Sequence, residues 1–472
     1  MGSKAKTIGD IVELVRGNTY KSALLDQPGP VLLGLASIER NGGFRSDKLR
    51  TYGGPSSEKH LVYPGDMYVS LKDITQQAFL LGSIARVPNE INVGRMTQDT
   101  VKLLFKDTTY SKELFYWVLR TPQYKEYCKG RALGTTNLSL SRDDFLAYEL
   151  PEENKKRCEI VNLLENIESK TSLSNQINKT LEQMAQTLFK SWFVDFDPVV
   201  DNALDAGFFE QELDLPDELR RRAEARKAVR AQAGFKPLPA ATRQLFPAAF
   251  EPCAEPSLGL GGWVPQGWEN IAIYSLAEFV NGAAYKAFEP NLEKRGLPII
   301  KIAELKSGVT SQTAFSDQAM PEKYRLTTGD ILFSWSGNPD TSIDTFVWTY
   351  SDAWLNQHIF KVTPPNEIGE RSFVLTALKS LKPIFADTAR NKQTTGLGHV
   401  TVADLKRLQI IKPESKVLAA WDHLVSPYLN QIHTLTLQTQ TLAQLRDTLL
   451  PKLISGELSL DDIELTTQQG AA

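Results

Sequence analysis

The sequence predicts an α+β protein built from two repeated globular domains joined by two long helices that pack as an antiparallel coiled coil. Two observations lead to this prediction. Short phrases recur in the same order at an offset of about 260 residues, and each copy closes with a long heptad pattern of apolar side chains. A chain of 472 residues is long enough for two to four domains, so two copies with their helices account for most of it.

Five phrases of the first copy are matched by similar phrases of the second. VRGNTYK (15–21) matches VNGAAYK (280–286), PGDMYVS (64–70) matches TGDILFS (328–334), TTNLS (135–139) matches TTGLG (394–398), LPEENK (150–155) matches KPESK (412–416), and TLEQMAQTLFKSW (180–192) matches TLAQLRDTLLPKL (441–453). The order is kept throughout. Chance does not produce five ordered matches, so the chain contains one unit twice.

Residues 1–150 and 263–413 form the globular part of each copy, and we call them the first and the second head. Apolar runs such as PVLLGLASI, HLVYPGDMYVSL, LPIIKIAEL and GDILFSWSG are broken by Gly, Pro, Asn and Asp, which is typical of strands and turns. Stretches such as KELFYWVLRTPQYKEYC predict short helices. Each head is therefore expected to be an α+β domain of about 150 residues.

A long helix is predicted after each head, over residues 151–198 and 414–456. The heptad seam consists of Ile160, Leu163, Ile167, Ile177, Leu181, Met184 and Leu188 in the first helix and Leu418, Trp421, Val425, Tyr428, Ile432, Leu435, Leu442 and Leu449 in the second. The alternative is that each amphipathic helix lies on its own head. Matched lengths at the same place in two repeats favour an antiparallel pair, in which roughly 37 residues span about 55 Å.

The segment 199–262 between the copies is predicted to be a linker of mixed character, and residues 457–472 a C-terminal tail. The linker holds an acidic stretch, then the basic run of residues 220–230, then a stretch rich in Pro and Ala. The basic run has helical composition and could contact phosphates. A solvated linker helix is the more common role of such a run.

Composition describes an ordinary globular protein. The formal net charge is -3, with 23% charged and 42% hydrophobic residues, while the first head carries 20 basic against 16 acidic residues. The three cysteines, Cys128, Cys158 and Cys253, lie far apart, which indicates neither a disulfide framework nor a cysteine zinc site. The sequence has neither a signal-peptide pattern nor an apolar run of membrane length, so we expect a cytoplasmic protein without membrane contact.

The sequence offers little catalytic chemistry. Asp143, Asp144, Glu153 and Lys155 have the outline of a nuclease site, but acidic residues after a proline also mark a helix start in both copies. The stretch NPDT (338–341) lacks the second proline and the aromatic residue of an adenine methyltransferase motif. No GxxxxGK[ST] loop occurs, and the five histidines show no metal-ligand spacing. We therefore predict no catalytic, cofactor-binding or metal site.

Several phrases resemble a known family. TLFKSWFVDFDPV (187–199) and LRDTLLPKLISGEL (445–458) are similar to the ends of the two conserved regions in specificity subunits of type I restriction-modification enzymes. LFPAAFEPCAEPSLGLGGWVPQGWE (245–269) resembles the junction into the family's second recognition domain, and TGDILFSWSG (328–337) and LNQHIF (355–360) resemble strands of that domain. The resemblance covers essentially the whole chain, and its most specific parts are the two helix ends.

The resemblance implies a non-catalytic subunit for DNA recognition and DNA methylation. The heads would be two target recognition domains that each read one half of an asymmetric bipartite sequence in double-stranded DNA. The helices would set the gap between the half-sites and dock two DNA adenine methyltransferase subunits. ATP-dependent restriction and translocase subunits would complete the restriction system. S-adenosylmethionine, ATP and Mg²⁺ would then be bound by the partner subunits and not by this chain.

Polar and cationic side chains predicted for loops of the heads are the candidates for DNA contact, because base edges and phosphates are read by such groups. They are Lys72, Arg86, Arg95, Lys129, Arg131, Thr135 and Asn137 in the first head and Ser334, Trp335, Ser336, Asn338, Arg390, Lys392, Gln393 and Thr394 in the second. The threonines at 135, 136, 394 and 395 recur in both copies, which favours a shared turn. Residues that differ between the heads are better candidates for reading sequence.

Two other interpretations stay open. One is a structural adaptor whose helices hold proteins together without reading DNA, and it would show no salt-dependent, sequence-selective binding. The other is a free-standing nuclease that uses Asp144, Glu153 and Lys155, in which Glu153→Ala would abolish Mg²⁺-dependent cleavage by the chain alone.

Overall fold

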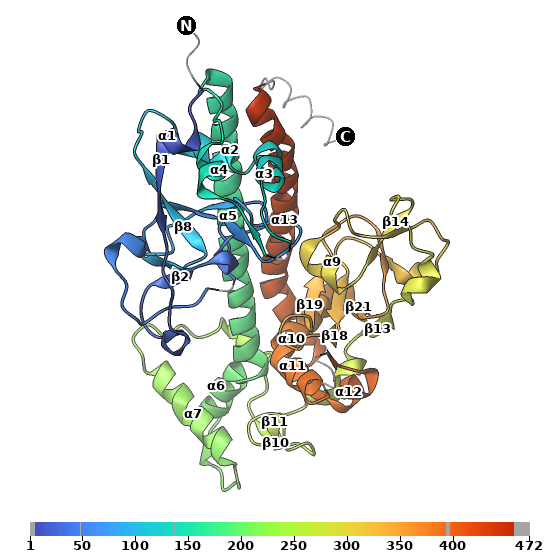
Figure 1. The fold of residues 1–472 in the computed structure, drawn as a ribbon. Helices are drawn as coiled ribbons and strands as arrows, with labels where there is room; N and C mark the ends of the chain where they lie inside the picture. The colour runs from blue at the N-terminus through green and yellow to red at the C-terminus, as the bar shows by residue number, and fades with distance from the viewer. Residues whose placement is uncertain (1–4, 48, 136, 393–396, 457–472) are drawn as a thin grey trace. The chain divides into compact units, whose positions relative to one another are not determined.

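The computed structural model describes residues 5–47, 49–135, 137–392 and 397–456 (Figure 1). The chain divides into two compact units, residues 1–172 with 440–472 and residues 173–439. Each unit holds one head and a part of both long helices. The predicted C-terminal tail, 457–472, lies outside the described residues.

The first head is built on a four-stranded antiparallel sheet in the order β1-β8-β4-β6. A second sheet has the order β2-β7-β3, and β5 pairs with β9. The strands are β1 Val12–Arg16, β2 Val31–Leu33, β3 Leu61–Val62, β4 Met67–Ser70, β5 Lys72–Asp73, β6 Ile84–Arg86, β7 Gly94–Met96, β8 Thr100–Phe105 and β9 Leu138–Ser139. The helices are α1 Ile8–Ile11, α2 Lys112–Val118, α3 Pro122–Gly130 and α4 Arg142–Leu146, with short 3-10 turns η1 Ser22–Leu24, η2 Leu35–Ser37 and η3 Glu58–His60.

The second head repeats this topology. Its main sheet has the order β13-β21-β17-β19, its second sheet the order β15-β14-β20-β16, and β18 pairs with β22. The strands are β12 Glu269–Ala272, β13 Glu278–Asn281, β14 Leu297–Ile300, β15 Phe315–Ser316, β16 Arg325–Leu326, β17 Ile331–Ser334, β18 Ser336–Gly337, β19 Asp344–Val347, β20 Ala353–Leu355, β21 Ile359–Thr363, β22 Gly398–His399 and β23 Gln409–Lys412. The helices are α9 Ile302–Ser307, α10 Glu367–Ser380, α11 Lys382–Arg390 and α12 Val402–Arg407, with 3-10 turns η5 Ile273–Ser275, η6 Tyr285–Phe288 and η7 Glu322–Tyr324.

The repeated Gly-Asp phrase has a structural cause. Asp66 and Asp330 each follow a glycine with positive φ, at 86° and 98°, in the turn before β4 and β17. Asp66 pairs with Lys102 of β8 and Asp330 with Lys361 of β21, both at 2.9 Å. The lysines also donate to the main-chain oxygens of Leu61 and Arg325 in the same places. The phrase therefore fixes a turn to its neighbouring strand in both heads.

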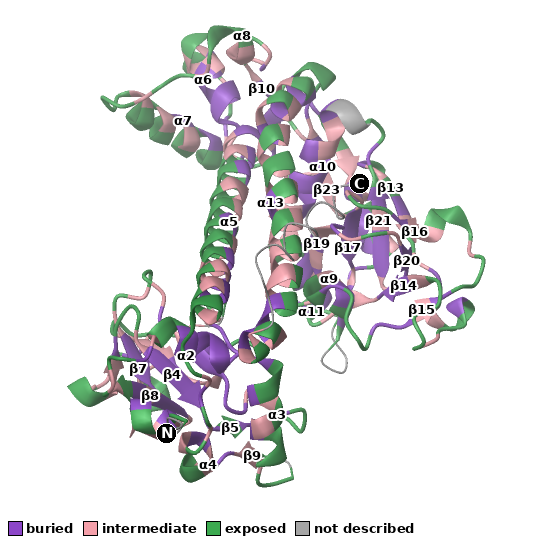
Figure 2. Cartoon of the chain, turned by 90° about the horizontal axis from the view of Figure 1, so that it is seen from above, coloured by how far each residue is buried: buried purple, intermediate pink, exposed green. Residues whose placement is uncertain are grey.

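The two ends of each head lie beside each other. In the first head the main chain of Leu150 donates to Lys6 at 2.8 Å, and that of Ile8 donates to Tyr148 at 3.0 Å. In the second head β12 pairs with β23 in an antiparallel ladder. Figure 2 shows that the strands inside both heads are largely buried. Each head is thus a closed domain whose chain enters and leaves at one place.

The long helices, α5 Lys155–Phe193 and α13 Ser415–Ser455, are antiparallel. In the first unit Arg157, near the start of α5, donates to the main chain of Leu453 and Ile454, near the end of α13, at 3.1 and 2.7 Å. In the second unit Trp192, near the end of α5, packs against Trp421, near the start of α13, with ring centroids 5.6 Å apart. The start of α5 is capped by Asn154, whose side chain accepts from the main chain of residue 157.

The prediction of the α5 seam is wrong at two positions. Ile177 and Met184 are 38% and 42% exposed, whereas Ser174 and Ala185 are buried. The buried residues of α5 are Ile160, Val161, Leu164, Ile167, Ser174, Ala185, Phe189, Trp192 and Phe193. The prediction placed a seam residue three positions after Leu181, at Met184. The structure buries the residue four positions after it, Ala185. Leu163, Leu181 and Leu188 are half-buried, and all predicted seam residues of α13 are buried or half-buried.

The linker is folded onto the core of the second unit, which differs from a solvated helix. It holds most of α6 Asp197–Asp205 and all of η4 Phe208–Glu210, α7 Asp217–Arg230, α8 Ala240–Arg243 and β10 Phe250–Pro252, which pairs with β11 Trp263–Pro265 at the start of the second head. Leu219 and Ala223 of α7 are buried. The charged stretches pair with each other, because Arg222 contacts Asp197, Arg226 forms two bonds with Asp201 at 2.9 and 2.7 Å, and Arg230 contacts Asp205 at 2.6 Å. These three arginines of the basic run thus hold α7 on α6.

Candidate nucleic-acid interface

The described part of the chain contains no group of three or more His, Cys, Asp or Glu side chains placed to hold a metal ion. The residues with a nuclease outline have local contacts. Asp144 bonds the hydroxyl of Ser141 at the start of α4, and Glu153 accepts from the main chain of Ser111 at the start of α2. Among the described helices, none is long and apolar enough to cross a membrane.

In the second head, Trp335 lies beside two imidazoles. It stands between β17 and β18, and its ring centroid is 5.5 Å from that of His358 and 5.8 Å from that of His399. Its indole N–H donates to Asn281 at 3.0 Å. All three rings are half-buried. We call this place, where β17 ends, β18 pairs with β22 and β21 begins, the strand-end edge of the second head.

The other candidates of the second head surround this edge. Ser334 and Ser336 are buried, and the hydroxyl of Ser334 has no hydrogen-bond partner among the described residues. Exposed Asn338 accepts from the main chain of residues 340 and 341 and so caps the turn after β18. Arg390 contacts Asp340 of this turn at 2.7 Å. Lys392 pairs with buried Asp404 at 2.6 Å. Gln393 and Thr394 lie outside the described residues, as does Thr395.

In the first head, Lys72 occupies the equivalent edge. It lies in β5 and pairs with Asp99, just before β8, at 3.1 Å, with both side chains partly exposed. Asp73 is buried and accepts from the main chain of Thr75 and Leu80 at 2.7 and 2.6 Å, which fixes the following loop. Thr135 and Asn137, in the loop before β9, are exposed, and Thr136 is not among the described residues.

Arg86 and Arg95 are placed elsewhere, and the structure gives both a packing role. Arg95 is 2% exposed, donates to the main chain of Thr19 at 2.8 Å and lies over the ring of Tyr52. A guanidinium so deeply buried offers no surface to DNA, so the prediction for Arg95 is wrong. Arg86 points to α5 and bonds Glu165 at 3.0 Å and Glu168 at 2.6 Å. Its charge is therefore used inside the first unit.

Arg86 belongs to a cluster that fastens the first head to α5, and we call it the clamp. Arg120 contacts Glu168 at 2.5 Å, the hydroxyl of Tyr116 donates to Glu168 at 3.0 Å, and the indole of Trp117 donates to Glu165 at 2.7 Å. Burial opposes the charged form of Glu168, but attraction from Arg120 and Arg86 outweighs it and lowers the pKa of this carboxyl. The clamp is a half-buried ionic network.

Lys129 and Arg131, at the end of α3, are exposed. Lys129 lies 3.7 Å from Glu126, and Arg131 lies over the ring of Tyr127 and 3.9 Å from Asp144. Exposed ion pairs of this kind contribute little to stability, about 0–1 kcal/mol. Both cations thus remain able to contact phosphates.

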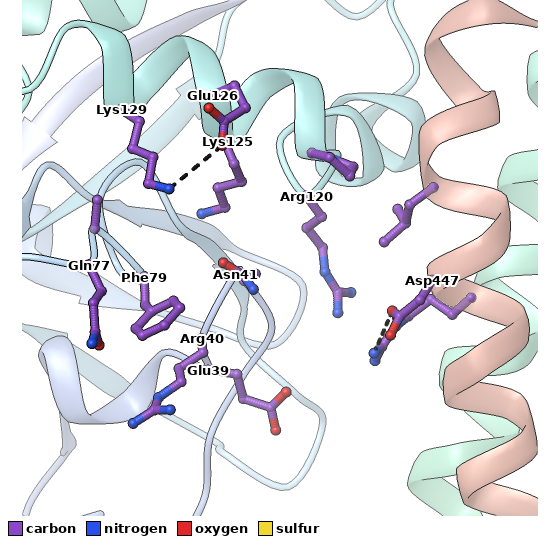
Figure 3. Close-up of a pocket in the computed structure, with 15 residues that line it drawn as sticks. Glu39, Arg40, Asn41, Gln77, Phe79, Arg120, Lys125, Glu126, Lys129 and Asp447 are labelled. Carbon is purple, nitrogen blue, oxygen red and sulfur yellow. Dashed lines mark hydrogen bonds and ion pairs between the residues drawn. The ribbon is translucent and has the colours of Figure 1, made fainter. Parts of the chain in front are cut away.

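A cavity of about 450 Å³ lies beside α3 in the first unit (Figure 3). The charged residues that line it are Glu39, Arg40, Arg120, Lys125, Glu126, Lys129, Arg446 and Asp447. Burial lowers the pKa of Lys125 to about 7, and its amine lies 2.5 Å from the hydroxyl of Ser83. Figure 3 shows Lys129 bonded to Glu126. Cations and carboxylates alternate around the cavity, which does not define one kind of ligand.

Comparisons with known proteins agree with this architecture. Residues 265–445 match the family described as "Type I restriction modification DNA specificity domain". The type I restriction enzyme HindI specificity subunit of Haemophilus influenzae is 24% identical over 353 residues, 72% of this chain and 74% of that one. The MjaIX specificity subunit of Methanocaldococcus jannaschii is 22% identical over 399 residues, 81% of this chain and 76% of that one.

A solved structure shares the fold. The crystal structure of the type I restriction-modification system S subunit from M. genitalium superposes with a TM-score of 0.51 at 13% identity, over 95% of each chain. Over most of its length the chain is similar to specificity subunits of type I restriction-modification systems. Its fold is two repeated α+β heads joined by two long antiparallel helices.

Sequence reasoning missed the imidazoles of the strand-end edge and their counterparts in the first head. His358 comes directly before β21, as Asp99 comes directly before β8. The signal was available in the repeat, since SWSG and SLKD follow the matched strands at the same spacing. An alignment of the two heads by that phrase would have pointed to this edge.

Proposed function

We propose that this specificity subunit reads an asymmetric bipartite sequence in double-stranded DNA, with one half-site for each head as target recognition domain. The observation that carries the proposal is one strand framework used twice with different side chains at the same edge. Two equal frameworks can dock on DNA in the same way, and two different surfaces then read different bases. The subunit itself is proposed to be non-catalytic.

The helices are proposed to dock two DNA methyltransferase subunits. Support comes from α5, where Leu173, Ile177 and Met184 are 57%, 38% and 42% exposed. Their spacing places them along one side of the helix, next to half-buried Leu181. Large apolar side chains aligned on an exposed helix face are suited to a protein partner.

The remaining parts of the proposal concern the partners. S-adenosylmethionine would be bound by the methyltransferase subunits, and ATP and Mg²⁺ by restriction and translocase subunits. The complex would act in the cytoplasm, where the DNA is. The gap between the half-sites would be set by the lengths of α5 and α13, since about 1.5 Å of rise per residue fixes the span of a helix.

The proposal is tested by mapping methylated adenine. The full chain is co-expressed with its methyltransferase partner in a host that lacks DNA methylation, and the genome is read by single-molecule sequencing. We expect a bipartite, asymmetric motif that appears only when this chain is present. Absence of any motif, despite a stable complex of the two proteins, would favour the structural adaptor instead.

A further inference from the structure

We infer that equivalent positions at the strand-end edge of each head determine which bases that head reads. The side chains available for base contact are Lys72, Asp99 and Ser139 in the first head and Trp335, His358 and His399 in the second, whereas the counterparts Leu71 and Ser336 are buried. The inference rests on the proposed function, because it names the residues that would distinguish the two half-sites.

The equivalence follows from strand register. Ser70 pairs with Thr100 in the first head, and Ser334 pairs with Ile359 in the second. Asp99 directly precedes Thr100, and His358 directly precedes Ile359, so Asp99 and His358 occupy equivalent positions.

The neighbouring two-stranded ladder has the same register. Lys72 pairs with Ser139, and Ser336 pairs with His399. Between the two ladders, the carbonyl of residue 71 accepts from residue 140 at 2.9 Å, and that of residue 335 accepts from residue 400 at 2.8 Å. Backbone geometry at the edge is thus shared, while the side chains at the equivalent positions differ.

In the first head the edge carries opposite charges. Lys72 and Asp99 are 48% and 32% exposed in their side chains. An ion pair of this exposure contributes about 0–1 kcal/mol to stability. Breaking it so that Lys72 and Asp99 contact DNA therefore costs little free energy. A lysine donates to guanine N7 or O6, and an aspartate accepts from the cytosine amino group. The edge of the first head is suited to a G·C pair.

In the second head the same edge is aromatic and carries no acidic or lysine side chain at these positions. Burial, and then the neighbouring His399, lowers the pKa of His358 below its usual value, which favours its neutral form. A neutral imidazole donates through one nitrogen and accepts through the other. The half-buried indole of Trp335 beside the imidazoles adds apolar surface, which suits the methyl group of thymine. The two edges therefore prefer different base pairs.

The strand framework next to the edge is the same in both heads, because Lys102 and Lys361 hold the same turn. The packing at the edge differs, since Leu71 is buried in the core of the first head and the ring of Trp335 lies 6.0 Å from that of Phe360. Two half-sites that differ require different chemistry at equivalent places.

The test uses the full chain in complex with its methyltransferase partner. Methylation rates are measured on a set of duplexes in which each base of both half-sites is varied in turn. Lys72→Ser gives the first head the residue of the second at this position. We expect it to lower methylation of the original first half-site about tenfold and to change the base preferred there, with the second half-site unchanged. Lys59→Ser, the same substitution at another exposed lysine of the same head, should leave both preferences as they are.

The reciprocal variant carries Trp335→Leu, Ser336→Lys, His358→Asp and His399→Ser. We expect a changed preference in the second half-site alone. Should the fourfold variant fail to fold, His358→Asp by itself tests the same edge. If Lys72→Ser and His358→Asp both keep the wild-type preferences in an assembled, active complex, the inference is overturned. If the wild-type complex methylates no bipartite motif, the proposed function fails instead.

Discussion

The two heads share a fold but are fastened to the long helices by different chemistry. The first head uses the ionic clamp of Arg86 and Arg120 on Glu165 and Glu168. The second head uses aromatic packing, in which Phe373 of α10 lies 5.6 and 5.1 Å from the rings of Phe189 and Phe193 of α5.

Trp421 of α13 closes this aromatic cluster, with centroids 5.8 Å from Phe189 and 5.0 Å from Phe193. Ion pairs are also present in the second unit, as Lys379 contacts Glu182, but Glu182 is 42% exposed. The comparison teaches that the head framework tolerates either attachment. The chemistry of the attachment then decides how each unit responds to mutation and to acid.

The largest effect is expected from the aromatic attachment. Trp421→Ala removes a fully buried indole and should lower the free energy of unfolding of the second unit by about 4 kcal/mol, because the cavity it leaves is not refilled. Hydrogen exchange of peptides from each unit measures this separately for the two units. Leu292→Ala, at a 71% exposed leucine of the same unit, is the control and should change stability by less than about 0.5 kcal/mol. Equal loosening of both units would contradict the comparison.

A smaller effect is expected at the clamp. Glu168→Gln leaves the guanidinium of Arg120, which is 5% exposed in its side chain, without its carboxylate and should cost about 3 kcal/mol in the first unit. The matched substitution Glu182→Gln removes the exposed pair of the second unit and should cost less than about 1 kcal/mol. Hydrogen exchange of peptides from α2 and from α10 reports the two changes. A cost at Glu182 as large as that at Glu168 would show that burial does not separate the two pairs.

The smallest effect is a dependence on pH at the clamp. The pKa of Glu168 lies below its ordinary value of 4.5, because Arg120 and Arg86 outweigh burial. Its contribution to stability is therefore complete above the ordinary pKa and is lost as pH falls through the lowered one. We expect protection of the α2 peptides to decrease relative to that of the α10 peptides as pH falls below about 4.5 and through the lowered pKa of Glu168. Glu168→Gln should remove this difference, and its persistence in the variant would assign the effect to another group.

Much of the fold could be predicted because its signals are patterns within short stretches of sequence. The matched phrases identify two copies, and the heptads identify two helices. The exact seam could not be predicted, since Leu163 and Leu164 are both apolar and allow two frames. The buried partner at the later turn is Ala185, whereas the more hydrophobic Met184 is exposed. A small side chain in a close helix contact carries almost no sequence signal.

The site was harder to predict because a cation looks the same in sequence whether it is free or paired. Arg86 is bonded to carboxylates about 80 positions away, and Arg95 is buried under Tyr52. Only tertiary structure brings these partners together. Lys72 and Trp335, by contrast, follow repeated strands, where the repeat itself supplies the alignment. The strand-end edge could thus have been found from the sequence, and the clamp could not.

The meeting of the two ends of each head has a consequence for how such proteins change. The main chain of Leu150 donates to Lys6, and β12 pairs with β23. The first and last residues of each head therefore lie together, and we call this place the neck of the head. Exchange of a whole head at its neck would leave the sequence of the long helices unaltered. Under the proposed function, one such exchange would replace a complete half-site specificity, whereas a point mutation changes one side chain of a surface.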